Sequence, residues 1–448
     1  MRIPASITIK FRDLKNNQGF VKYSKNASWL FGEKILRIIV SFFVGIWVAR
    51  YLGPEQFGLF SYSQSFVGLF AVIATFGLDS IVIRELVKSE ARRDELIGTA
   101  FWLKLLGTFV VLGILAITVN LTSSDSYTNT LVFIIASATI FQSFNVVDFY
   151  FQAKVMSKYV VYANALPLFL GSLIKIVLIL NEAPLEYFAI SMVFDGFVLA
   201  CGFVYFYIKH APHLNIKNLT FKWEVAKHLL KDSWPLAFSG AVVAIYMRID
   251  QVMIKEMMDL SSVGQYAVAS KLSEAWYFIP MIIGTSLLPS IINSKKNNEK
   301  LYYKRLQNFY TLMVWLAIII ALLISFFSYD IVDILYGQDF HRASKVLVIQ
   351  AWVGVFASLG MACRNWYIAE NYITEALYKA IFGMVINIIG NYYLIQLYGI
   401  EGAAISSILG QISANIIYDF LDKKVRGQIK YKIRAFLPIY LIKKEEGQ

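Results

Sequence analysis

Charged side chains occur inside segments that are otherwise apolar enough to lie in lipid. The clearest case is the stretch YMRIDQVMI at residues 246–254, which follows PLAFSGAVVAI and carries Arg248, Asp250 and Gln251. A charged side chain at the centre of a bilayer costs roughly 2.5–3.5 kcal/mol on insertion scales, so it usually faces a partner, a water-filled cavity or the membrane interface. A guanidinium group binds phosphate through paired hydrogen bonds. An arginine in such a stretch therefore indicates an anionic ligand at membrane depth.

Other ionisable residues recur in apolar segments of both halves of the chain. Two pairs of opposite charge stand one helical turn apart and can form ion pairs on one helix face, namely Glu33 with Arg37 and Lys271 with Glu274. Arg364, like Arg248, is flanked by long apolar sequence. We expect four cations to bind substrate: Arg37, Arg248, Lys271 and Arg364. We expect five acids to bind a coupling ion or to form structural pairs: Glu33, Asp79, Asp148, Asp250 and Glu274.

Several polar residues in these segments also have simpler interpretations. Lys104, Lys175 and Lys379 have stems long enough to run along a helix and place the charge among the headgroups. Gln142 and Asn145 precede Asp148 at three-residue intervals, which predicts a polar stripe on one helix face. Trp and Tyr side chains can stack on sugars, but they are also typical anchors at the ends of transmembrane helices.

The composition is that of a membrane protein. The chain has 448 residues, of which 58% are hydrophobic and 16% charged, and its mean hydropathy is +0.57. An ordinary soluble domain has about 25% charged residues. The net charge of +12 is spread over short loops between apolar spans, so anionic membrane lipids are the expected partners and nucleic acid is not. The two cysteines, Cys201 and Cys363, fall inside apolar spans and predict neither a disulfide nor a metal site.

Hydropathy predicts an all-α integral membrane protein with about twelve transmembrane helices. The expected spans are residues 29–49, 59–79, 99–119, 129–150, 160–180, 187–208, 233–255, 264–288, 308–328, 346–368, 376–397 and 402–421. Lys and Arg concentrate in alternate loops, and the loops TSSDSYTN, NEAPLEY and YGIEG contain none. Because basic residues near span ends stay on the cytoplasmic side, we expect both termini in the cytoplasm. The N-terminus lacks the pattern of a cleaved signal peptide.

The two halves resemble copies of one six-helix unit. LGPEQFGLFSYSQS at 52 aligns with MDLSSVGQYAVASK at 258, which places Gly58 over Gly264 at an offset of about 206 residues. The alternative is that all apolar helices look alike. With an even number of spans in each half, the copies point the same way, as in transporters with parallel repeats. The expected divisions are a cytoplasmic segment 1–28, a bundle 29–210, a cytoplasmic linker 211–232, a second bundle 233–421 and a basic cytoplasmic tail 422–448.

The charged residues come from both halves, so we expect two pseudo-symmetric six-helix bundles to place them around a central, net-cationic cavity. Such a cavity suits phosphate-bearing or sugar-acid substrates. It would repel the organic cations that many drug exporters carry.

Three stretches closely resemble signature regions of the bacterial polysaccharide flippases. They are ARYLGPEQFGLFSYSQSF, YMRIDQVMIKEMMDLSSVGQYAVASKLSEAWYFIP and INIIGNYYLIQLYGIEGAAISSIL. These flippases are the Wzx-type transporters of O-antigen and capsule repeat units, within the superfamily of multidrug, oligosaccharidyl-lipid and polysaccharide exporters. The resemblance covers roughly residues 24 to 421. The tail after residue 421 is too short and basic for two further spans like those of the lipid II flippase, and it suggests a segment on the cytoplasmic surface.

The resemblance implies movement of an undecaprenyl-pyrophosphate-linked oligosaccharide across the bacterial inner membrane by alternating access. It implies no enzymatic activity, and its partners would be the lipid-linked substrate, membrane lipids and other polysaccharide assembly proteins. No cofactor is expected beyond a coupling H+ or Na+, which the sequence does not choose between.

Two alternatives come from other functional classes. A drug or cation antiporter of the same fold would need cavity carboxylates to outweigh arginines. A membrane-bound polymerase or glycosyltransferase would need a large extramembrane loop with clustered acids or a phosphate-binding loop, and the sequence has neither. A lipid scaffold without transport activity is a third possibility.

Overall fold

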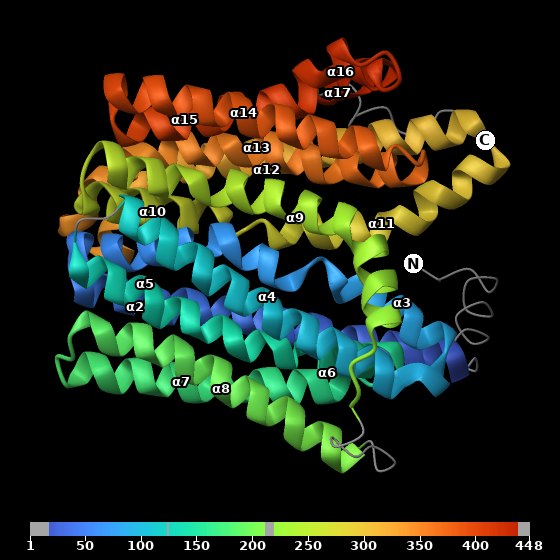
Figure 1. Ribbon diagram of the computed structural model, residues 1–448. Helices are drawn as coiled ribbons and strands as arrows, with labels where there is room; N and C mark the ends of the chain where they lie inside the picture. Colours follow the sequence, from blue (N-terminus) through green and yellow to red (C-terminus); the bar gives the residue numbers. More distant parts are fainter. Residues whose placement is uncertain (1–17, 123–124, 211–218, 438–448) are drawn as a thin grey trace, which may run out of the picture. The chain divides into compact units, whose positions relative to one another are not determined.

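The computed structural model describes residues 18–122, 125–210 and 219–437, and every regular element in these ranges is a helix (Figure 1). Ten helical stretches among them are long and apolar enough to cross a membrane. A helix satisfies its backbone hydrogen bonds internally, which lipid demands. The prediction of an all-α membrane protein is confirmed.

The ten stretches account for the expected spans with two differences. The first two spans lie in one helical stretch, Lys25–Lys88, which covers most of α2 (Gln18–Thr75) and all of α3 (Leu78–Lys88). Gly53 kinks α2 between these spans with φ 69° and ψ 175°. The expected span 264–288 is instead two shorter helices, α10 (Leu260–Glu274) and α11 (Phe278–Asn297), so it is absent from the ten.

The chain forms two compact units, and each unit combines two separate stretches of sequence. The first unit is Met1–Val48 with Phe70–Ala241, and the second is Ala49–Leu69 with Val242–Gln448. Two long helices, α2 and α9 (Trp223–Met257), therefore contribute residues to both units. The structure divides the chain within these helices, whereas the sequence suggested a division at the linker 211–232.

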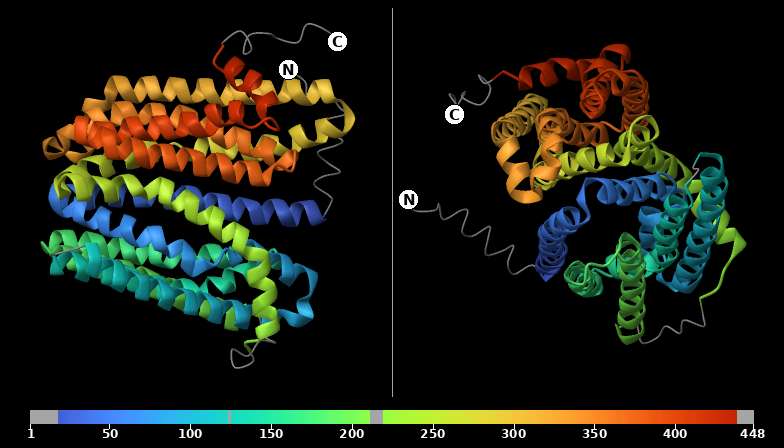
Figure 2. Two further views of the ribbon diagram at one scale, coloured as in Figure 1. Left: turned by 45° about the horizontal axis from the view of Figure 1, so that its top comes forward. Right: turned by 90° about the vertical axis from the view of Figure 1, so that its left-hand side faces the viewer.

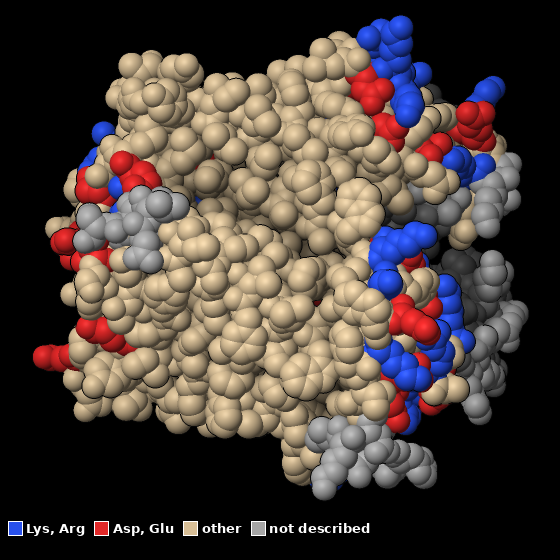
Figure 3. Space-filling model, viewed as in Figure 1, with Lys and Arg blue, Asp and Glu red and all other residues tan. Residues whose placement is uncertain are grey.

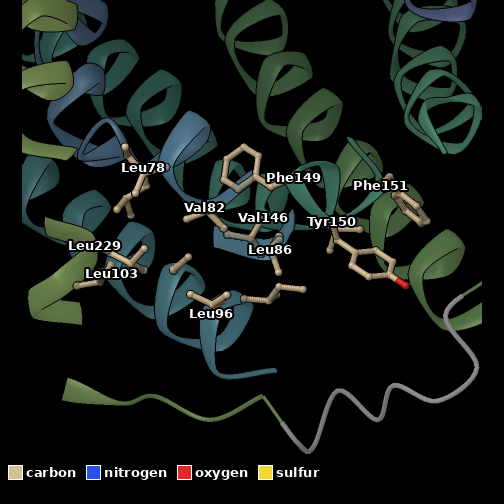
Figure 4. Packing of buried hydrophobic residues seen from close by; sticks show 14 of the residues in the cluster. Leu78, Val82, Leu86, Leu96, Leu103, Val146, Phe149, Tyr150, Phe151 and Leu229 are labelled. Atoms are coloured by element: carbon tan, nitrogen blue, oxygen red, sulfur yellow. The ribbon is translucent and has the colours of Figure 1, made fainter. Parts of the chain in front are cut away.

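The first unit is built around a core contributed by six of its helices. Besides parts of α2 and α9, its elements are α3, α4 (Arg93–Thr122), α5 (Ser126–Ser137), the 3-10 helix η2 (Ala138–Asn145), α6 (Val146–Ala153), α7 (Ser157–Leu180) and α8 (Leu185–His210). Leu78 and Val82 of α3 pack with Leu103 of α4 and Phe149 of α6, and Leu229 of α9 joins them (Figure 4). This core holds the start of α9 against α3 and α4.

The second unit contains long helices that lie side by side. Besides parts of α2 and α9, its main elements are α10, α11, α12 (Glu299–Tyr336), α13 (His341–Ala369), α14 (Ile373–Tyr398), α15 (Ile400–Ile412), the π-helical turn η5 (Ser413–Ile417), α16 (Tyr418–Leu421) and α17 (Ile429–Ala435). In Figure 2, helices α12 to α15 run alongside one another within this unit. Its core includes Phe309, Met313 and Val314 of α12 with Leu359 and Cys363 of α13.

Basic side chains gather at one end of the first unit's helices. Lys88 lies in the last turn of α3, Arg93 begins α4 and Lys154 follows α6. The Lys and Arg atoms near α3 form a group at this end of the helices (Figure 3). Within this unit, the Lys and Arg residues of the basic loops therefore lie together at one end of the helices, as their positions in the sequence predicted.

Two glycines allow a very close helix crossing in the second unit. A Cβ atom added to Gly58 of α2 would lie 1.7 Å from Leu260 O, and one added to Gly264 of α10 would lie 2.0 Å from Pro54 O. The Cβ position of Gly58 is also only 2.9 Å from the backbone nitrogen of Gly264. The repeat alignment superposes these same two glycines. Gly58 and Gly264 hold equivalent positions in the two repeats. Their contact is the one expected if a local twofold axis relates the two helix segments that contain them.

This crossing predicts a large cost for one methyl group. Gly264→Ala must shift backbone on both helices, and we expect it to lower the free energy of unfolding by about 1–3 kcal/mol. Gly45→Ala, in the same long α2, is the control because nothing lies within 4 Å of the added Cβ. The thermal unfolding midpoint in detergent measures both, and equal midpoints for the two variants would contradict the crossing.

The described part of the C-terminal tail folds back onto the second unit. Helix α17 packs against α12, and Lys432 of α17 is fully buried. Its Nζ lies 2.5 Å from Asp419 Oδ2 and donates to Asn415 O at 2.9 Å. A buried ion pair therefore anchors residues 422–437 to the second unit, and the expected position of the tail on the cytoplasmic surface stays a prediction. Residues 438–448 lie outside the described part of the chain.

Candidate functional site

A buried carboxylate, Asp250 of α9, lies at the centre of a polar network in the second unit. It accepts hydrogen bonds from Tyr266 Oη at 2.5 Å, Ser407 Oγ at 2.6 Å and Asn391 Nδ2 at 2.7 Å. Gln350 Nε2 donates to the Tyr266 hydroxyl at 2.7 Å, so α9, α10, α13, α14 and α15 all contribute. A buried charge is costly unless hydrogen bonds compensate it, and here three donors do.

Atoms beside this network have no hydrogen-bond partner within the described chain. Asn387 and Asn391 lie one turn apart on α14 and are fully buried. Both polar side-chain atoms of Asn387, and Oδ1 of Asn391, are unpaired. An unsatisfied buried polar atom costs about 1–3 kcal/mol. Gly410 allows close packing here, since a Cβ added to it would lie 3.0 Å from Asn387 Cβ and 3.1 Å from a ring atom of Tyr246.

The chemistry of these groups fits a small hard cation. The Asn391 amide nitrogen and the Ser407 hydroxyl both donate to Asp250 in the structure, and the oxygens of these three side chains are of the kind that such a cation would bind. Such cations prefer oxygen ligands, and unpaired amide oxygens are ready to serve as such ligands. A proton on Asp250 is the simpler alternative, but it would leave the Asn387 amide unpaired.

Two predicted substrate cations lie close to this network. Arg248, two residues before Asp250, is half-buried and donates from Nη1 to Gln64 O at 3.4 Å. The Nζ atom of Lys271 lies 4.5 Å from the centroid of the Phe57 ring. Glu274 is within electrostatic range of both cations. Among the described residues, however, no carboxylate oxygen comes within 4.0 Å of either cation, so the expected ion pair between Lys271 and Glu274 does not form.

The third cation of the second unit, Arg364, lies on α13 with an exposed side chain. It too has no ion-pair partner within the described chain. The neighbouring Asn365 donates to Gly284 O at 3.2 Å, which fixes α13 against α11 at this level. The three predicted substrate cations of the second unit thus have no carboxylate oxygen within 4.0 Å among the described residues, and the predicted acids Asp250 and Glu274 lie near Arg248.

The remaining predicted residues form a separate polar cluster in the first unit. Arg37 Nε donates to Glu33 Oε1 at 2.7 Å, which confirms that pair. Asp148 accepts a hydrogen bond from Gln152 Nε2 at 2.9 Å and lies within electrostatic range of Arg37 and Asp79. Here Arg37 has an acid beside it, in contrast to Arg248, Lys271 and Arg364 of the second unit.

Three lysines that have a simpler interpretation each have a polar partner in the structure. They are Lys104, Lys175 and Lys379, and their placement among the headgroups stays a prediction. Their Nζ atoms lie 3.2 Å from Asp79 Oδ1, 2.6 Å from Asp195 Oδ2 and 2.9 Å from Asn415 Oδ1, respectively. Pairing inside the protein removes most of the need for contact with water.

Sequence reasoning missed part of the Asp250 network. It singled out Asp250 and noted polar residues in α14, but not Tyr266, Gln350 or Ser407. Serine and tyrosine are common in transmembrane helices, so neither carries a signal by itself. The repeat alignment contains Tyr266, although nothing in it indicates that the hydroxyl faces a carboxylate.

Comparison with known proteins gives two overlapping family matches. A family model described as polysaccharide biosynthesis protein matches residues 23–295. A second model, MatE, matches residues 235–393. The first match covers more than half of the chain and includes Arg37, Arg248 and Asp250.

Two curated relatives match at low identity over most of the chain, and a third matches over part of it. An uncharacterised membrane protein of Methanocaldococcus jannaschii is 23% identical over 94% of this chain and 90% of its own length. The capsular polysaccharide biosynthesis protein CapF of Staphylococcus aureus is 20% identical over 90% and 99%, respectively. A probable low-salt glycan biosynthesis flippase of Haloferax volcanii is 27% identical over 37% of this chain and 35% of its own length.

Solved structures show the same fold. An inward-facing multidrug resistance transporter of the MATE family has a TM-score of 0.68 at 15% identity, covering 89% of this chain and 96% of its own. A lipid II flippase in an inward closed conformation has a TM-score of 0.66 at 16% identity, covering 93% of each chain. The chain therefore shares with both proteins a multi-pass helical membrane fold.

Proposed function

Because the chain belongs to the polysaccharide biosynthesis protein family, we propose that it is a flippase that moves a lipid-linked oligosaccharide across a membrane. Transport rather than catalysis fits both the family and the fold. The relatives named as a flippase and as a capsular polysaccharide protein support a glycan cargo. Their low identity leaves the glycan itself open.

The observation that carries this proposal is the set of unpaired cations in the second unit. Arg248, Lys271 and Arg364 have no carboxylate within 4.0 Å among the described residues, whereas Arg37, Lys104 and Lys175 do. A cation kept at membrane depth without a protein counter-ion is costly. A pyrophosphate head group would offset that cost through charge-assisted hydrogen bonds when it binds.

In its specific form, the proposed substrate is an undecaprenyl-pyrophosphate-linked repeat unit. The proposed location is the bacterial inner membrane with both termini in the cytoplasm, which agrees with the basic end of the first unit. The proposed route is alternating access, in which the pyrophosphate stays on the cations while its lipid tail remains in the bilayer. The expectation that Arg37 also binds substrate stays a prediction.

We also propose that Asp250 binds the coupling ion. The unpaired oxygens of Asn387 and Asn391 favour Na+ over a proton, because a proton would use neither of them. Tyr266 and Ser407 hold the Asp250 carboxylate in place by direct hydrogen bonds. Neutralising Asp250 would also alter the field at nearby Arg248 and Glu274, which would link ion binding to substrate binding.

A multidrug antiporter is the competing function, and the multidrug transporter among the structural matches favours it. An antiporter for organic cations needs acids to dominate its binding site. In the described second unit, Arg248 and Lys271 have no carboxylate oxygen within 4.0 Å, and the nearby acid Asp250 already accepts three hydrogen bonds. The antiporter predicts that loss of the gene makes cells sensitive to cationic dyes without changing surface polysaccharide.

The proposed function can be tested in a strain that needs this gene for its surface polysaccharide. We expect Arg248→Ala with Lys271→Ala to reduce polymer by about tenfold or more, because each removes a charge-assisted contact to the head group. Lys345→Ala, a change of charge at the start of α13, is the control for loss of positive charge alone. Undiminished polymer at normal protein abundance would refute this role for the cations.

A further inference from the structure

We propose that Gly68 of α2 is a positioning residue that fixes the guanidinium group of Arg248. The proposal rests on the role of Arg248 in the proposed function and adds a second residue to that site. Gly68 itself contacts no ligand in this proposal. Its contribution is the absence of a side chain.

The geometry at this glycine is unusually tight. A Cβ atom added to Gly68 would lie 2.5 Å from Arg248 Nε, 2.6 Å from Cδ and 2.6 Å from Cζ. The guanidinium end of Arg248 therefore lies directly on the backbone of α2. All three contacts are with one side chain and none is with backbone, so an added methyl group would displace Arg248 rather than separate the helices.

Helix geometry explains why this position must be glycine. A Cβ atom on a helix points toward the N-terminus and covers the preceding turn. At position 68 that turn contains the carbonyl of Gln64, and Arg248 Nη1 donates to this oxygen at 3.4 Å. Without a Cβ at position 68, the guanidinium reaches the carbonyl. Arginine has five N–H donors, so one bond to a carbonyl leaves most of them for a phosphate.

Neighbouring contacts hold the two helices in place around this arginine. Ser65 Oγ of α2 donates to Gln251 Oε1 of α9 at 2.8 Å. One turn further along, Tyr62 Oη donates to Glu256 Oε1 at 3.4 Å. These bonds fix the crossing of α2 and α9 independently of Arg248. A methyl group at position 68 would therefore displace the Arg248 side chain and leave the two helices in place.

A double-mutant cycle in the polysaccharide-dependent strain tests this inference. We expect Gly68→Ala to lower polymer by about tenfold, as Arg248→Ala does, because the displaced guanidinium loses its charge-assisted contacts. Adding Gly68→Ala to the Arg248→Ala protein should cause no further loss. Gly45→Ala is the matched control in the same helix, where the added methyl meets nothing within 4 Å, and should remain near the wild-type level.

Each outcome separates this inference from the function on which it rests. Wild-type output from Gly68→Ala, with loss in Arg248→Ala, would overturn the positioning role and leave the proposed function intact. Wild-type output from Arg248→Ala would instead remove Arg248 from the proposed function. If Gly68→Ala lowers the thermal midpoint, the same substitution is measured again in the Arg248→Ala protein. If the midpoint no longer falls in that protein, the result supports the inference. If it still falls, Gly68 serves helix packing alone.

Discussion

Replacing Lys432 with methionine is expected to lower the free energy of unfolding by about 3–5 kcal/mol. Lys432 and Asp419 are both 0% exposed, and their charges lie 2.5 Å apart. Removing one partner leaves the other charge buried without compensation, which costs far more than the pair contributes when intact. The Asn415 carbonyl would lose its donor as well. The thermal unfolding midpoint in detergent would report the change.

Two further variants show whether the buried pair is the cause. Lys430→Met, also in α17 but with an exposed side chain, is the matched control and should leave the midpoint nearly unchanged. Lys432→Met combined with Asp419→Asn should lose less than Lys432→Met alone, because no unpaired charge then remains buried. If Lys430→Met and Lys432→Met had equal midpoints, α17 would not be anchored in this way.

Replacing Asp250 with asparagine is expected to abolish ion-dependent transport while keeping the fold. The side chains are nearly the same size, but one oxygen acceptor becomes an NH2 donor that faces another donor. That mismatch should cost about 1–3 kcal/mol of stability. The larger effect is functional, since the charge proposed to attract the coupling ion is lost.

The measurement compares thermal midpoints in NaCl and in choline chloride at equal ionic strength. A ligand that binds only the folded protein raises its stability, so Na+ should raise the midpoint of the wild type and not that of Asp250→Asn. Asp333→Asn, an exposed acid at the end of α12, is the control and should respond as the wild type does. The absence of a sodium effect on the wild type would rule out Na+ at Asp250 and favour a proton.

The membrane fold could be predicted from the sequence because hydropathy is averaged over many residues. This average stays high even where a few residues depart from the apolar pattern. The break between α10 and α11 escaped prediction, since residues 264–288 remain apolar across it. The buried pair of Lys432 and Asp419 was also missed. Basic residues after a last span ordinarily indicate a surface tail, and only packing reveals that one lysine turns inward.

Charge was the signal that singled out residues of the candidate site, whereas contacts between helices left no signal in the sequence. Asp250 and Arg248 stood out because charge in an apolar stretch is rare. Tyr266 and Ser407 did not, because neutral polar residues occur at many positions in such helices. The role of Gly68 depends on a crossing of two helices whose residues are 180 positions apart in the chain (Gly68 and Arg248), and no local pattern encodes that crossing.

The central claim is that cations without a carboxylate partner receive a negatively charged head group. The most direct test is reconstitution of the purified protein in liposomes with a polyprenyl-pyrophosphate-linked oligosaccharide, whose movement between leaflets is followed by accessibility of a label on the glycan. We predict that the wild type moves this lipid and that the combined alanine variant of Arg248, Lys271 and Arg364 falls to the rate of protein-free liposomes. A neutral polyprenyl glycoside without phosphate should not be moved. Equal rates for the charged and neutral lipids, or wild-type rates from the triple variant, would contradict the account.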